Sequence, residues 1–167
     1  MINTQFSAVV IAPFGAVGIV TQDDFLLNLE LLSHEMLAHE ILASAAIKKP
    51  AINAFTQTIV NQVSAYFVDA STALNGSYCL QGTPFQKRVW NAIANIPLGQ
   101  VLNYTQLADK VGSGPRAVAN ACGANNIPLF IPCHRVVAKS GLGGFMQGEA
   151  SGLSIKQWLL KHEGVAL

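Results

Sequence analysis

Charged residues and long apolar runs are both scarce in this chain, and each scarcity excludes a class of protein. Only 11% of the 167 residues are charged and 51% are hydrophobic, which argues against intrinsic disorder and predicts one compact domain, or two small ones, with a real core. The longest nearly apolar run, residues 8–20, is interrupted by Pro13, Gly15 and Gly18 and falls short of the roughly 18 residues of a membrane helix. The N-terminal segment lacks the features of a secretory signal, so we expect a cytoplasmic protein.

Cysteine is also scarce, and its arrangement fits neither a disulfide framework nor a zinc cluster. The cysteines are Cys79, Cys122 and Cys133, an odd number without a Cys-x-x-Cys pair. His34 and His39 lie five positions apart, whereas the helical zinc-protease motif needs its two histidines at i and i+4 to place them on one face. We therefore expect a reducing compartment and no bound metal.

The net charge is only +1, but it is divided unevenly along the chain. Residues 1–81 carry two basic and six acidic side chains, a net charge of −4, and residues 82–167 carry eight basic and three acidic, a net charge of +5. A basic second half is suited to face phosphate groups. A solvated basic surface without a partner explains the same count equally well.

The first strands and the first helix are predicted from apolar patterning. Short apolar stretches at residues 6–11 and 16–20, separated by a Pro-Phe-Gly sequence, predict a β-hairpin. Residues 26–49 end in a lysine pair followed by Pro50. This ending predicts a helix with cations at its negative end.

A second helix and a linker follow. Apolar residues at spacings of three and four predict an amphipathic helix over residues 51–67. Residues 75–84 contain Asn-Gly and Gly-Thr-Pro sequences, which are typical of an extended linker. Residues 1–81 are therefore predicted to form a small α/β module with its linker.

The second half is predicted to be mostly helical. One apolar face indicates a helix over residues 85–96. Asn103 is suited to cap a short helix that ends before the break at residues 112–114, and Pro115 is suited to start the next one. Two short helices around a tight turn form a helix-turn-helix. The second helix, "PRAVANACGAN", is rich in small residues, which suit close approach to a DNA groove and packing against another helix equally well.

One reactive cluster interrupts an apolar run at residues 127–137, "IPLFIPCHRVV", where the pattern predicts a buried strand. A single cysteine in an apolar stretch is usually a small buried hydrophobe, and we apply that interpretation to the other two cysteines. Cys133 differs because Pro132 is suited to begin a turn with free N–H groups, while His134 and Arg135 supply positive charge or accept a proton. Since the thiolate is the nucleophile, the cluster predicts a reactive cysteine.

Four separated motifs resemble one family of DNA repair proteins, the O6-alkylguanine-DNA alkyltransferases. The central motif is "IPCHRVV" at residues 131–137, and the others are "GTPFQKRVWNAIANIPLGQVLNY" at 82–104, "GPRAVANACGAN" at 114–125 and "GLSIKQWLLKHEG" at 152–164. They agree with the family in order and spacing and cover about half the chain. Members of this family move an alkyl group from guanine onto their own cysteine.

The resemblance implies an α/β fold with two parts. Residues 1–81 would form a small ribonuclease-H-like module, and residues 82–167 a mostly helical winged helix-turn-helix domain that binds DNA and carries the active site. It also implies a monomer that needs no cofactor, metal, membrane or obligate protein partner. The partner would be duplex DNA containing alkylated bases, bound through the minor groove.

The resemblance assigns catalytic roles to five residues. Cys133 would accept the alkyl group, and His134 would deprotonate the thiol through a bridging water, with Glu163 orienting the imidazole. Tyr104 would protonate the departing base and press on the backbone phosphate. Asn125 would fix the turn between the recognition helix and the cysteine.

Further positions are implied to contact DNA or the substrate. Arg116 would fill the gap left by the extruded nucleotide, because a base inside the stack cannot present its O6 group to a thiol. The implied DNA-binding residues are Arg116, Tyr104, Ala117, Ala121 and Arg135. The implied substrate pocket is formed by Val136, Phe145, Lys156 and Ser151, with Lys156 steadying the loop.

The sequence also departs from the family pattern. Asn126 follows the hinge asparagine where the family has proline, and the loop after Gly141 is longer than usual. Phe145 stands where tyrosine is often found, and Ser151 is the candidate for a hydroxyl donor in this loop. The size of the accepted alkyl group is therefore left open.

Three other functions compete with this prediction. A non-catalytic alkylated-DNA-binding protein would have another residue in place of Cys133. A cysteine hydrolase would use the same residue types but would leave the helix-turn-helix unexplained, and a DNA-binding regulator would leave the Pro-Cys-His-Arg cluster unexplained. We therefore predict a single-turnover alkyltransferase acting on O6-alkylguanine, with O4-methylthymine left open as a second substrate.

Overall fold

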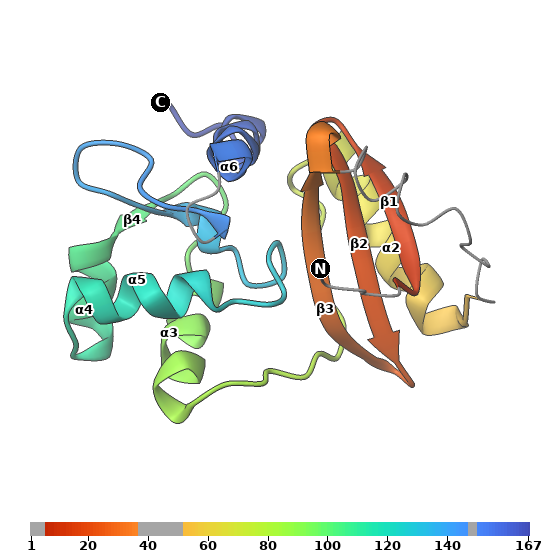
Figure 1. Ribbon diagram of the computed structural model, residues 1–167, viewed down its shortest axis with the longest axis horizontal. Coiled ribbons are helices and arrows are strands. Elements are labelled where there is room, and N and C mark those ends of the chain that lie inside the picture. Colours follow the sequence, from red (N-terminus) through yellow and green to blue (C-terminus); the bar gives the residue numbers. More distant parts are fainter. Residues whose placement is uncertain (1–5, 37–51, 147–149) are drawn as a thin grey trace. The chain divides into compact units, whose positions relative to one another are not determined.

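Two units make up the fold, and each has its own buried core. The computed structural model describes residues 6–36, 52–146 and 150–167, and the chain divides into residues 1–79 and residues 80–167. None of the described helices is both long and apolar enough to cross a membrane. The architecture is mixed α/β (Figure 1).

The first unit is built on a three-stranded antiparallel sheet of β1 (Ala8–Ala12), β2 (Gly15–Gln22) and β3 (Phe25–Ser33), in that order. The predicted hairpin is confirmed as β1 and β2. Its turn requires glycine at position 15, because φ is +147° and a Cβ there would lie 2.1 Å from the carbonyl oxygen of Leu32. Sheet and turn together place β2 in the centre.

The third strand corrects the helix predicted over residues 26–49. Residues as far as Ser33 are extended and pair with β2, and Leu29 and Leu31 are buried at alternate positions. A leucine-rich segment is compatible with a helix or a strand, and here the backbone hydrogen bonds to β2 favour the strand. Residues 34–36 are helical, as predicted, and the part of that prediction on residues 37–49 lies outside the described residues.

The predicted amphipathic helix is confirmed as α2 (Ala54–Val68). Its buried face contains Ile59, Val63 and Tyr66, which are at most 2% exposed. These residues lie at the three- and four-residue spacing that brings side chains to one side of a helix. The helix covers one face of the sheet (Figure 1).

The second unit is mostly helical. Its only pair of strands among the described residues is parallel, with Leu102 opposite Val136. In chain order the elements are α3 (Pro84–Ala94), β4 (Leu102–Asn103), α4 (Tyr104–Val111), α5 (Pro115–Gly123), the 3₁₀ turn η1 (Cys133–Arg135), β5 (Val136–Val137) and α6 (Ala150–His162).

Local signals set the ends of the first three helices. Thr83 and Asn103 each cap a helix through a reciprocal capping box with a glutamine three residues on. Gly112 closes α4 in the left-handed conformation at φ 66°, and Pro115 occupies the first turn of α5. The predicted roles of Asn103 and Pro115 are confirmed.

Trp90 connects two of these helices in the core. Its side chain is fully buried, and its indole N–H donates a 2.7 Å hydrogen bond to the carbonyl oxygen of Ala121. The bond therefore links α3 to α5 near the end that approaches Cys133.

We expect Trp90→Phe to lower the free energy of unfolding by about 2–4 kcal/mol, because it leaves a small cavity and removes the partner of a buried carbonyl. Urea denaturation followed by circular dichroism measures this loss. The matched control is Trp158→Phe, since Trp158 is half-buried and stacks on His162 with ring centroids 4.6 Å apart. An equal loss in both variants would contradict a special role for the Trp90 hydrogen bond.

Candidate active site

Asn125 holds the loop between α5 and the reactive cysteine. Its Nδ2 donates to the carbonyl oxygen of Ile131 at 2.9 Å, and its Oδ1 accepts from the backbone N–H of Ile127 at 3.1 Å. One side chain thus joins both sides of the turn. These bonds are made by Asn125 itself, so they do not need proline at position 126.

Cys133 lies at the start of η1 rather than on the predicted strand. Pro128 and Pro132 lack the N–H groups that a strand ladder needs, and residues 127–131 form a loop. The backbone N–H of Cys133 donates to the carbonyl oxygen of Ile131 at 2.7 Å, which tightens the turn. The thiol is therefore carried by a short turn, and only 8% of the residue is exposed.

The environment of Cys133 keeps it a thiol, contrary to the expectation that its neighbours favour thiolate. Burial raises the pKa of the Cys133 thiol. The Asn125 amide, the charge of Lys156 and the backbone N–H groups of Cys133 and His134 oppose this only in part. A base is therefore required at the moment of reaction.

His134 is suited to be that base. It is 1% exposed, and its Nε2 lies 2.9 Å from Oε1 of Glu163. Burial lowers the pKa of His134, although Glu163 opposes this, so the imidazole is neutral near pH 7. With Nε2–H directed to the carboxylate, the lone pair lies on Nδ1. Nδ1 is buried and bonds to none of the described residues.

Glu163 is shared between His134 and Arg135. Arg135 donates from Nε to Oε2 at 2.8 Å and from Nη2 to Oε1 at 2.9 Å. Burial alone would raise the pKa of Glu163, but the hydrogen bonds from His134 and Arg135 hold it well below its usual range. The expected contact of Arg135 with DNA is not supported, because these bonds hold its guanidinium inside the protein.

Lys156 supports the opposite side of the site. It is fully buried, and its Nζ donates to the carbonyl oxygens of Val136 at 2.6 Å and Gly144 at 2.9 Å. Burial lowers its pKa to about 8. Nζ also lies 5.8 Å from the ring centroid of Phe145, so one ammonium group holds together the strand after the cysteine and the loop opposite.

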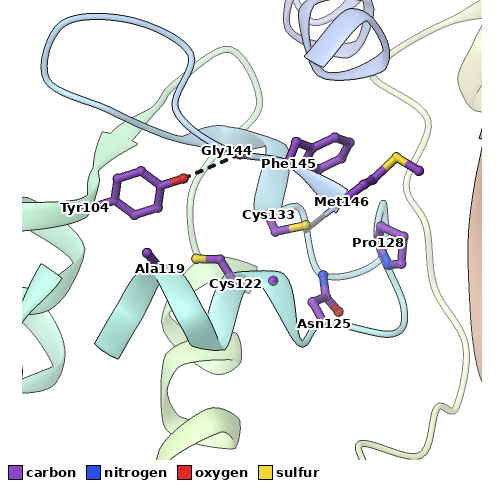
Figure 2. Close-up of a pocket in the computed structure, with 10 residues that line it drawn as sticks. Tyr104, Ala119, Cys122, Asn125, Pro128, Cys133, Gly144, Phe145 and Met146 are labelled. Carbon is purple, nitrogen blue, oxygen red and sulfur yellow. Dashed lines mark hydrogen bonds between the residues drawn. The ribbon is translucent and has the colours of Figure 1, made fainter. Parts of the chain in front are cut away.

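A cavity of about 250 Å³ opens onto the Cys133 thiol (Figure 2). Its walls come from α4, α5, the Asn125 loop, η1 and the segment before α6. The lining residues are Tyr104, Ala119, Cys122, Gly123, Asn125, Pro128, Cys133, Gly144, Phe145 and Met146. Tyr104, Asn125, Cys133 and Phe145 were all predicted as site residues, and the structure brings them together.

Tyr104 reaches the cavity from the first position of α4. Its hydroxyl lies 3.5 Å from the carbonyl oxygen of Gly144, and burial, followed by the charge of Cys122, raises its pKa. The loop crosses the ring closely, since a Cβ on Gly143 would lie 2.9 Å from Tyr104. The phenol therefore remains protonated and able to donate.

Other predicted site residues lie away from the cavity. Arg116 is exposed and Ala117 half-buried at the start of α5, and Ser151 is not among the lining residues. Ala121 is wrong as a DNA contact, because it is 2% exposed and its carbonyl accepts the bond from Trp90. Arg116, Ala117 and Ala121 all lie on α5, and they differ in exposure because their side chains leave the helix in different directions.

Sequence reasoning missed the position of Cys122. Rather than being fully buried, it is half-buried and lines the cavity. Burial, followed by the charge of Cys133, raises its pKa to about 12, so it is a poor nucleophile. Helical spacing would have found it, because Ala119, Cys122 and Gly123 stand at i, i+3 and i+4. Cys79, also expected to be buried, is exposed.

The buried imidazole makes stability depend on pH. The pKa of His134 is lowered in the folded protein, so the unfolded chain binds a proton more readily and stability is lost as pH falls below the unfolded value of about 6.5. Glu163, whose pKa is also lowered, adds to the loss below about pH 4.3.

We therefore expect urea midpoints to fall between pH 7.5 and about pH 5.5 more steeply in the parent protein than in His134→Gln, which cannot titrate there. The exposed histidine His34 provides the matched control, His34→Gln. It should follow the parent, and a flat parent curve would contradict the burial argument.

Comparison with known proteins identifies the family. The pattern of the 6-O-methylguanine DNA methyltransferase DNA-binding domain matches residues 84–165. The methylated-DNA–protein-cysteine methyltransferase of Shigella flexneri is 48% identical over 88 residues, 52% of this chain and 50% of that protein. The chain thus spans about half the length of this relative. The protein of the same name from Methanosarcina acetivorans is 40% identical over 112 residues, 66% of this chain and 70% of its own.

The similarity to solved structures covers more of the chain than the sequence matches do. The O6-methylguanine methyltransferase of Mycobacterium tuberculosis has a TM-score of 0.74 and 33% identity, covering 95% of this chain and 93% of that one. The structure of Mycobacterium tuberculosis OGT in complex with DNA has a TM-score of 0.72 and 30% identity, covering 93% and 91%. By sequence and by fold, the chain belongs to the O6-methylguanine DNA methyltransferase family.

Proposed function

We propose that this protein repairs DNA by moving the alkyl group of O6-alkylguanine onto its own Cys133. One observation carries the proposal: the Cys133 thiol opens into a cavity of about 250 Å³, and the next residue, His134, is paired with Glu163 at 2.9 Å. The volume suits a single nucleobase. The names of the relatives and their identity in this part of the chain support the same activity.

The proposed step is an in-line displacement. His134 takes the thiol proton through a bridging water, and the sulfur of Cys133 attacks the alkyl carbon. A carbon–sulfur bond forms, the bond from that carbon to O6 breaks, and its electron pair remains on the guanine. Tyr104 then gives the departing base a proton. Because the thioether formed is inert to hydrolysis, each molecule acts once.

The DNA is proposed to bind to residues 82–167. In this proposal α4 and α5 form the helix-turn-helix of a winged domain, Ala117 faces the minor groove and Arg116 fills the gap left by the extruded base. The complex of the mycobacterial relative with DNA supports a DNA partner. Residues 1–81 would form the ribonuclease-H-like module, whose sheet and helix are compatible with that description.

The oligomeric state, partners and location of the protein belong to the same proposal. The protein acts as a monomer on duplex DNA, without a cofactor, metal or obligate protein partner, in the cytoplasm of a bacterial-type cell. Val136 and Phe145 form the base pocket with Lys156, while Ser151 stays a candidate hydroxyl donor. The alternative, a non-catalytic protein that binds alkylated DNA, is disfavoured because Cys133 and its base are both present.

Intact-protein mass spectrometry tests the proposal. After incubation with excess duplex containing one O6-methylguanine, we expect the parent to gain the mass of one methyl group, located on Cys133 by peptide mapping. Cys133→Ala should gain none, and Cys79→Ala, which removes an exposed thiol, should behave like the parent. DNA binding without any gain in mass would favour the non-catalytic alternative.

Salt dependence tests the DNA surface. Since a net charge of +5 on residues 82–167 implies mainly phosphate contacts, we expect affinity for duplex DNA to fall steadily with salt. Arg116→Ala, which removes one positive charge from α5, should weaken binding and make the slope of log affinity against log salt shallower, while Arg116→Lys should keep the slope. Fluorescence anisotropy measures both quantities. Affinity that is independent of salt would contradict this surface.

A further inference from the structure

The Glu163 carboxylate lies in a place that is unfavourable for a negative charge. It follows α6 directly, and its N–H still donates to the carbonyl oxygen of Leu159. The end of a helix carries partial negative charge, and the carboxylate is fully buried. It therefore needs positive partners inside the protein.

Arg135 supplies a permanent charge at this point. Two of its nitrogens grip the two oxygens of Glu163, and the third, Nη1, donates to the carbonyl oxygen of Ile96 at 2.7 Å. The guanidinium is thereby held between the turn after α3 and the end of α6. A planar fork suits this two-oxygen contact, and a single ammonium group does not.

Several charges act on His134 together. Burial lowers its pKa, the Glu163 carboxylate opposes this, and the charges of Arg135 and Lys156 lower the pKa further. The Cys133 thiol is its chain neighbour. The elements packed against η1 are α3 and α6. Their other charged or titratable side chains are the exposed Lys87, Arg88 and Lys161 and the half-buried His162.

We propose that Arg135 is a positioning residue for alkyl transfer: by holding both oxygens of Glu163, it limits the pull of the carboxylate on His134 and keeps the imidazole uncharged and ready to take the Cys133 proton. The assignment rests on the alkyl-transfer function proposed above. Without Arg135, the whole carboxylate charge would act on His134 and favour its protonated form, which cannot accept a proton.

Two measurements on three variants test this role. The first is the single-turnover rate of methyl transfer from excess O6-methylguanine duplex, measured from about pH 5.5 to about pH 8.5. The second is an NMR titration of His134 in the free proteins, assigned with His134→Gln. The variants are Arg135→Gln, Arg135→Lys and, as a matched control on the surface of α3, Arg88→Gln.

In Arg135→Gln we expect His134 to titrate at higher pH than in the parent. The ratio of parent to variant rate should then grow as pH falls, by roughly tenfold for each unit by which the His134 pKa rises. Arg135→Lys should shift the pH dependence of the rate and the His134 titration in the same direction but by less. If Arg135→Gln does not fold, Arg135→Lys still tests the proposal. Arg88→Gln should match the parent.

A purely structural role gives a different result. The rate would fall by one factor at every pH, with no change in the His134 titration, and that outcome overturns the proposal. Failure of the proposed function gives a different result, because the parent protein itself would then gain no methyl group. The NMR titration needs no activity, so it still decides whether Arg135 controls the charge of His134.

Discussion

Burial of the Glu163 carboxylate constrains everything around the reactive cysteine. A buried negative charge at a helix end needs two hydrogen-bonded partners, and it finds them in His134 and Arg135. Arg135 in turn reaches the Ile96 carbonyl. One carboxylate therefore joins the turn after α3, the cysteine turn and the end of α6. The hydrogen bonds that stabilise the buried Glu163 carboxylate also orient the His134 imidazole.

The same helix supports the other wall of the site. Lys156 lies on α6 seven residues before Glu163, which directly follows the helix and still donates its N–H to the carbonyl oxygen of Leu159. Its ammonium group binds the carbonyls of Val136 and Gly144, beside the cavity that Cys133 enters. The helix and the residue that follows it thus contribute two buried charges of opposite sign, and each holds a different segment of the chain in place.

The electrostatics favour a cysteine that reacts only on demand. Burial raises the pKa of Cys133 and lowers that of His134, so both groups are neutral before substrate arrives. A preformed thiolate would also be open to other electrophiles and oxidants. For the single-turnover alkyl transfer proposed above, a buried thiol stays protected until the substrate nucleobase enters the cavity.

Local chemistry allowed much of this to be predicted. The capping residue Asn103, the start at Pro115 and the cluster around Cys133 depend on near neighbours in the chain, so the sequence by itself determined them. Tertiary structure alone decided that β3 replaces part of a predicted helix, because β2 supplies its hydrogen-bond partners. It also turned Arg135 inward to Glu163, since only folding brings this carboxylate, 28 residues away in the chain, beside the guanidinium.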